Sequence, residues 1–81
     1  MARVELGRFM YAEQEPSLDC WTVRNRKSNG ALGYAEWYHP WKTAAFVASS
    51  EAVIFSPDCL QEIVKFLGRL NKERKEADDD R

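Results

Sequence analysis

Residues 21–41 read WTVRNRKSNGALGYAEWYHPW and contain the clearest fold signal in the chain. Apolar and polar residues alternate in the first four positions, which is typical of a β-strand. Asn29-Gly30 then provides the positive φ geometry that a tight hairpin turn requires. A second strand is expected over 31–38, and both of its faces carry apolar or aromatic side chains. The stretch therefore predicts a β-hairpin in which the second strand is covered on both sides.

The flanking segments extend this hairpin into a sheet. Strands are expected over 3–11, 19–25, 31–38 and 41–48, with 52–55 as a short fifth strand or a lead-in to a helix. The alternation in the first strand changes parity near Gly7, so its register is expected to break there. Residues 13–17 are expected to form a loop, and His39-Pro40 ends the 31–38 strand because proline cannot donate to a β-ladder.

One helix is predicted at the end of the sequence. Ser56 is a suitable N-cap, Pro57 fits the first helical position, and Asp58 favours the positive end of the helix dipole. The predicted buried face of this helix consists of Leu60, Ile63, Val64, Leu67 and Leu70. Gly68 interrupts this pattern, and we interpret it as a position that allows close approach of the helix to the sheet.

These elements predict a single α+β domain over 1–75 and a disordered acidic tail over 76–81. Its fold is an antiparallel meander of four to five strands with one C-terminal helix packed on one face. The core is expected to contain Val4, Leu6, Trp21, Val23, Phe46, Ile54, Leu60, Ile63, Val64 and Leu67. Because one helix covers one face, the other face is solvated, self-associated or available to a partner.

The composition argues against several classes of protein. The 81 residues carry a net charge of −1, which is unlike a strongly basic nucleic-acid binder. No run of 18 apolar residues and no signal-peptide pattern is present, so we expect a cytoplasmic protein. Three tryptophans, three tyrosines and four phenylalanines can fill a core without a metal or disulfide framework.

The residues that could support catalysis or metal binding are few. Cys20, His39 and Cys59 are widely separated and lack the paired spacing of a zinc site. A thiol enzyme would have to pair His39 with one of the cysteines, and Cys59 lies in the first helical turn, where reactive thiols occur. We expect instead that both cysteines are reduced core residues. The protein is therefore predicted to be no enzyme, with no catalytic residue, metal or cofactor.

The candidate binding surface combines an aromatic run with a basic hairpin. The partner-binding residues we predict are Tyr34, Tyr38, His39, Trp41, Arg24, Arg26 and Lys27. Tryptophan and tyrosine are enriched at protein-binding hot spots, although the same run could close the edge of the sheet as a hydrophobic cluster. Aromatic stacking beside basic residues could alternatively bind single-stranded nucleic acid. A homodimer through the open sheet face is a further expectation.

Three motifs carry a resemblance to a known group of proteins. They are W-x-V-x-N at 21–25, L-G-x-x-x-W-x-x-x-W at 32–41 and F-S-x-x-C-L-x-x-I-x-x-F-L at 55–67. Over residues 21–70 the chain resembles short uncharacterised proteins of phages and prophages. The resemblance implies an accessory protein that binds and modulates or inhibits a host protein, such as a CRISPR, restriction or other defence component. Residues 1–18 lie outside the pattern and are expected to carry individual specificity.

Overall fold

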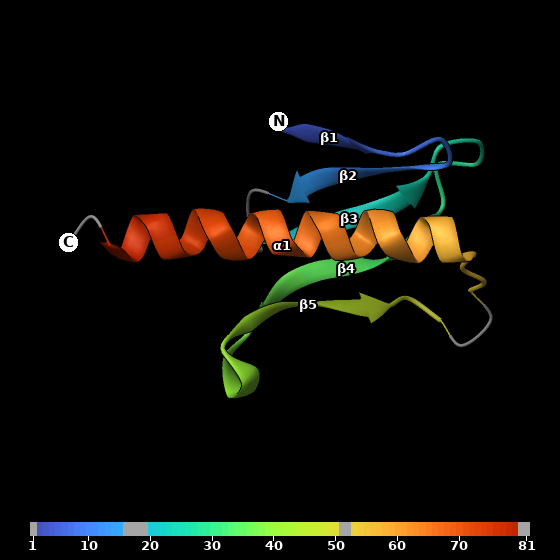
Figure 1. Ribbon diagram of the computed structural model, residues 1–81. Coiled ribbons are helices and arrows are strands. Elements are labelled where there is room, and N and C mark those ends of the chain that lie inside the picture. The colour runs from blue at the N-terminus through green and yellow to red at the C-terminus, as the bar shows by residue number, and fades with distance from the viewer. Residues whose placement is uncertain (1, 16–19, 51–52, 80–81) are drawn as a thin grey trace.

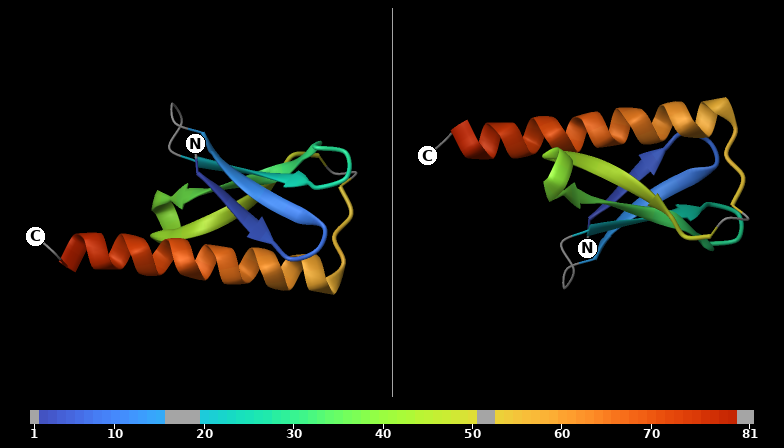
Figure 2. Two further views of the ribbon diagram at one scale, coloured as in Figure 1. Left: turned by 90° about the horizontal axis from the view of Figure 1, so that it is seen from above. Right: turned by 90° about the horizontal axis from the view of Figure 1, so that it is seen from below.

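A computed structural model describes residues 2–15, 20–50 and 53–79, with side chains as far as residue 75 (Figure 1). Its elements are β1 (Arg3–Leu6), β2 (Met10–Glu15), β3 (Cys20–Asn25), β4 (Ala31–Tyr38), the short 3-10 helix η1 (His39–Trp41), β5 (Thr43–Ala48) and α1 (Pro57–Asp79). The five strands form one antiparallel sheet in the order β1-β2-β3-β4-β5. Helix α1 lies across one face of the sheet, and no described helix lies on the other (Figure 2). The predicted α+β meander with one C-terminal helix is therefore confirmed.

The N-terminal strand prediction was wrong in its extent. Residues 3–11 are not one strand, because the chain turns at Gly7, where φ is +67°, and returns as β2. The loop expected over 13–17 is strand as far as Glu15, which pairs with Cys20 of β3. Residues 16–19 lie outside the described residues. Polar side chains at 13–15 suit this strand because alternate positions of an antiparallel sheet can face solvent.

The segment between β5 and α1 is also not a strand. Residues 53–56 have no regular structure, and Ala52 lies outside the described residues. The Phe55 ring instead packs edge-to-face on the Phe46 ring, with 5.5 Å between the ring centroids. This contact joins the lead-in segment to the core without adding a sixth strand.

The core lies between the sheet and α1. Its buried members are Leu6, Met10, Ala12, Val23, Ala35, Ile63 and Phe66. The Trp21 ring meets the Phe66 ring edge-to-face at 5.3 Å, which attaches β3 to the middle of α1. Gly33 leaves room for the Phe46 ring, because a Cβ at Gly33 would lie 2.4 Å from Phe46 Cζ. Small residues in the central strands thus let large rings from β5 and α1 reach the core.

Three residues of the predicted core are exposed instead. Ile54 is 91 % exposed, and Leu60 and Val64 are also exposed on α1. The helix is a single rod across a small, twisted sheet, so it buries a narrower stripe than its apolar pattern indicates. Gly68 also differs from its interpretation, because it is exposed and a Cβ there would meet no atom within 4 Å.

Helix α1 begins as its sequence predicts and continues further. The Cys59 N–H donates to Ser56 Oγ at 3.2 Å, which confirms Ser56 as the N-cap. The helix continues to Asp79, and its last turns extend beyond the sheet (Figure 1). Residues 80–81 lie outside the described residues, and the domain boundary at residue 75 stays a prediction. Within the described ranges, no helix has the apolar length needed to cross a membrane.

Candidate functional site

The sheet face opposite α1 has two halves, and the half formed by β1, β2 and β3 is covered by its own side chains. The Arg3 guanidinium lies 3.9 Å from the centre of the Tyr11 ring. The Tyr11 hydroxyl donates to Asn29 Oδ1 at 2.8 Å, and Tyr11 is buried although α1 does not cover it. The cation–π contact and the hydrogen bond give the ring and the hydroxyl of Tyr11 partners within the chain.

Polar pairs continue this cover toward β3. Thr22 Oγ1 donates to Glu15 Oε1 at 3.1 Å, and Thr22 is buried. Arg24 Nε lies 3.4 Å from Glu13 Oε2 across the β2–β3 pair. A ligand on this half would have to displace side chains that are already paired, so this half is a poor binding surface.

The half formed by β4 and β5 presents aromatic side chains to solvent. Tyr34 and Tyr38 are exposed on the face that α1 does not cover, and Val47 of β5 is exposed beside Tyr34. Trp41 is 73 % exposed, and its ring meets the Tyr38 ring edge-to-face at 4.9 Å. We call Tyr34, Tyr38 and Trp41 the aromatic patch. It is the part of this face where large side chains remain open to a partner.

The turn between β4 and β5 fixes the position of Trp41. Pro40 lies in the first turn of η1, and Lys42 closes that turn with a left-handed backbone, φ 51° and ψ 46°. The Lys42 N–H donates to the His39 carbonyl at 3.2 Å. His39 is exposed on the same turn. The chain therefore reverses direction within a few residues and holds the Trp41 ring against Tyr38.

Arg26 acts within the fold. Its Nη2 donates to Glu5 Oε2 at 2.6 Å and to the carbonyls of Gly7 and Met10 at 3.2 Å, and its Nε donates to the Arg8 carbonyl at 3.3 Å. The hydrogen bond from Arg26 lowers the pKa of Glu5 below its ordinary value of 4.5, and Arg3 lowers it further. Arg26 thus stabilises the β1–β2 turn. These contacts join residues far apart in sequence, so no local sequence pattern predicts them.

The predicted binding residues are spread along the length of β4 and the adjoining end of β3. Tyr34 and Tyr38 lie on β4 and His39 and Trp41 in the turn after it, whereas Arg24 lies on β3 and Arg26 and Lys27 in the β3–β4 turn. A strand of the length of β4 separates its two ends by about 23 Å at ~3.3 Å per residue. Arg24 and Arg26 are paired with Glu13 and Glu5, whereas Lys27 Nζ makes no ion pair with any described residue. The structure brings Tyr38 and Trp41 into ring contact far from Arg26 and Lys27, whereas Tyr34 lies near Arg24, because Tyr34 pairs with Thr22, two residues from Arg24 in β3.

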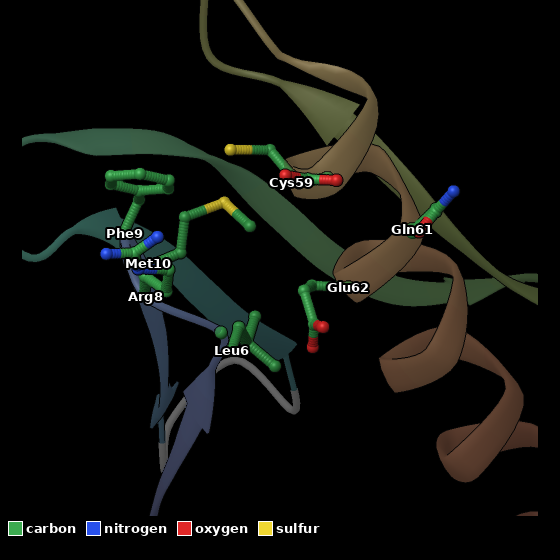
Figure 3. A pocket seen from close by; sticks show the side chains of 9 residues that line it. Leu6, Arg8, Phe9, Met10, Cys59, Gln61 and Glu62 are labelled. Atoms are coloured by element: carbon green, nitrogen blue, oxygen red, sulfur yellow. The ribbon is translucent and has the colours of Figure 1, made fainter.

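A hollow at the start of α1 was not anticipated from the sequence. Figure 3 shows Leu6 and Met10 from the sheet side facing Cys59 and Glu62 of α1, with Phe9 at the margin. Phe9 is exposed, and Gly7 approaches α1 so closely that a Cβ would lie 2.9 Å from Glu62 Cγ. The hollow holds about 190 Å³. This volume is below the ~300–1,000 Å³ typical of pockets that hold small ligands.

Cys59 and His39, one of the pairs considered for thiol chemistry, lie near different parts of α1. Cys20 is buried and Cys59 is half-buried. Cys59 lies in the first turn of α1, whereas His39 is close to Thr43, which hydrogen-bonds to Asn71 twelve residues further along the helix. At ~1.5 Å per residue Cys59 and Asn71 are roughly 18 Å apart along α1. Among the described residues, no three His, Cys, Asp or Glu side chains lie close enough together to hold a metal ion.

Comparison with known proteins gives one informative match. The uncharacterised 9.3 kDa protein of Acholeplasma phage L2 is 35 % identical to this chain over 54 residues, which is 67 % of this chain and 68 % of the phage protein. No family model and no solved structure matches the chain. The match agrees with the phage-type resemblance of residues 21–70.

Proposed function

This chain belongs to the same family as the uncharacterised 9.3 kDa protein of Acholeplasma phage L2, and on this premise we propose that it is a phage accessory protein that binds a host protein. The partner is a component that the phage benefits from modulating or inhibiting, such as a defence or CRISPR protein. The observation that carries the proposal is the exposed Trp41–Tyr38 pair on the open sheet face. In this proposal the protein acts by contact and carries out no reaction.

The aromatic patch has the properties of a binding hot spot. Tryptophan and tyrosine supply most of the binding energy in many protein interfaces. The Trp41 ring is held by Tyr38 and by the short turn of η1, so few degrees of freedom are lost when a partner covers it. A prearranged ring of this size fits a pocket on a partner protein.

The surroundings of the patch supply a polar rim. Glu36 lies between Tyr34 and Tyr38 on the same face of β4 and is exposed, and Lys42 follows Trp41 and is exposed. Protein interfaces commonly surround their aromatic anchors with polar, solvent-accessible side chains. The matching surface on the partner is therefore an apolar pocket flanked by residues of both charges.

Single-stranded nucleic acid is a weaker candidate ligand. Stacking bases on Tyr34 and Tyr38 requires cations near the same strands to hold the phosphates. Arg24 lies near Tyr34 but is paired with Glu13, and Arg26 is paired with Glu5. We therefore do not propose nucleic-acid binding, and the nuclease step of the experiment below distinguishes it from protein binding.

The test is capture of a partner from bacterial lysate by the immobilised protein, after nuclease treatment. We expect a stoichiometric protein band with the wild type that is lost with Trp41→Ala. Phe9→Ala is the matched control, because Phe9 is also an exposed aromatic but lies at the β1–β2 turn. The Phe9→Ala variant should retain the band. Retention of the band by Trp41→Ala, or recovery of nucleic acid that nuclease removes, would contradict the proposal.

A further inference from the structure

The two edges of the sheet are protected to different degrees. At the β1 edge, Arg3 and Glu5 are exposed charged residues, with Arg3 Nε 3.3 Å from Glu5 Oε1. Strand β5 at the other edge reads TAAFVA and contains neither a charge nor a proline. Natural proteins usually place charges, prolines or bulges on edge strands, because an unprotected edge pairs with further strands. Strand β5 lacks these protections.

Hydrogen bonds at the ends of β5 show which backbone groups face outward. The Ala44 N–H donates to Asn71 Oδ1 of α1 at 2.7 Å, so it points away from β4. The Ser49 N–H donates to the Leu32 carbonyl of β4 at 2.9 Å, so it points inward. Because these directions alternate along a strand, the N–H and C=O groups of Phe46 and Ala48 point outward. Nothing in the described part of the chain is hydrogen-bonded to these outward groups.

An apolar stripe of α1 faces the same side as this edge. Leu60 and Val64 are exposed, and with Leu67 they follow the spacing that leads to Asn71, which contacts β5. The opposite flank of the helix, at Glu62, Lys65 and Arg69, lies toward β1 instead. A strand added beside β5 would therefore extend the sheet toward this stripe.

We propose that the occupant is a second copy of this chain, with the two β5 strands paired antiparallel about a two-fold axis at Val47. In this register Phe46 of each copy lies opposite Ala48 of the other. The outward N–H and C=O groups of both residues are then satisfied reciprocally, and Ala44 keeps its hydrogen bond to Asn71 at the end of the ladder.

The chemistry of β5 favours its own copy as the partner strand. An uncharged strand pairs with itself without bringing like charges together. The second copy also presents the apolar side chains of Phe46 and Ala48 on its helix-facing side, where they can cover the exposed Leu60 and Val64. Val47, exposed on the open face, is covered by Val47 of the second copy. A single symmetric contact thus satisfies the backbone edge and covers apolar residues on both sides of the sheet.

Cross-linking tests both the dimer and its register. In the full chain with Cys20→Ala and Cys59→Ala, we expect Val47→Cys to form a disulfide-linked dimer under mild oxidation, because residues on the axis form a non-hydrogen-bonded pair with Cα atoms ~4.5 Å apart. Ala45→Cys is the matched control on the same strand and face. The register places its two copies about 14 Å apart, so it should not cross-link. Equal cross-linking of both variants would overturn the register.

Sedimentation equilibrium of the unmodified protein gives the second measurement. We expect a dimer for the wild type and a monomer for Val47→Lys, which brings two ammonium groups together on the axis. Phe9→Lys, an exposed position at the other edge, should remain dimeric. A wild type that stays monomeric at every concentration would overturn the inference. Dimerisation does not depend on the proposed host partner, because Trp41→Ala should lose the partner and keep the dimer.

Discussion

Replacement of Trp41 by alanine tests whether the aromatic patch is surface or core. Trp41 is 73 % exposed, so roughly a quarter of its side chain is covered. Truncation of a buried Trp or Phe to Ala costs about 3–5 kcal/mol, and a quarter of that is ~1 kcal/mol. Loss of the edge-to-face contact with Tyr38 adds ~0.5–1 kcal/mol. The expected loss in the free energy of unfolding is therefore about 1–2 kcal/mol.

Trp21→Ala is the internal comparison for this measurement. Trp21 packs against the buried core and meets the Phe66 ring of α1 edge-to-face, so its removal leaves a cavity between β3 and the helix. We expect a loss of roughly 3–4 kcal/mol, about twice that of Trp41→Ala or more.

Urea unfolding followed by circular dichroism measures both losses. Thermal unfolding gives an independent value, because 1 kcal/mol corresponds to a shift of about 4–8 °C in Tm for a domain of this size. If Trp41→Ala proves as destabilising as Trp21→Ala, Trp41 is a core residue, and failure of that variant to capture a partner would report unfolding instead of a lost contact.

Two further predictions concern the glycines and the Arg26–Glu5 pair. Gly33→Ala should lower the free energy of unfolding by about 1–3 kcal/mol, because its Cβ would lie 2.4 Å from both Phe46 Cζ and the Val47 carbonyl oxygen. Gly68→Ala should raise it by ~0.5–1 kcal/mol, because Gly68 occupies an open helical position. Urea unfolding checks both, and a shift of the same sign in each would contradict the packing described. The pKa of Glu5 is lowered in the folded state, so its carboxylate stabilises the fold above the ordinary value of 4.5, and this contribution is lost as the pH falls through the folded-state pKa. The Tm difference between wild type and Glu5→Gln should therefore be present at neutral pH and shrink as the pH falls below 4.5; a difference that stays constant to pH 2 would refute the pairing.

Much of the central sheet could be predicted from local pattern. The turn is encoded at Asn29, which has a φ of 62°, and the strands on either side pair as expected except for a register shift between Val23 and Arg24. The helix start was equally visible, because an N-cap serine followed by proline is a local signal. Elements whose signals lie within a few residues were therefore predicted well.

The errors arose where the outcome depends on contacts distant in sequence. The apolar periodicity of α1 includes Leu60 and Val64, but the width of the sheet decides how much of that stripe is buried. The ion pairs of Arg24 and Arg26 were likewise not predicted, because their carboxylate partners lie in β2 and β1. Pairing of this kind depends on the register of the folded sheet, which composition and spacing do not reveal.

The charges of Arg3 and Glu5 at the β1 edge limit how far the sheet can grow. Joining two copies through β5 uses the unprotected edge of each, and both ends of the enlarged sheet are then β1 strands. A third copy would have to pair its backbone along exposed charged side chains, which is unfavourable. Growth therefore terminates at two chains, so an edge that would otherwise nucleate a fibre gives an assembly of fixed size.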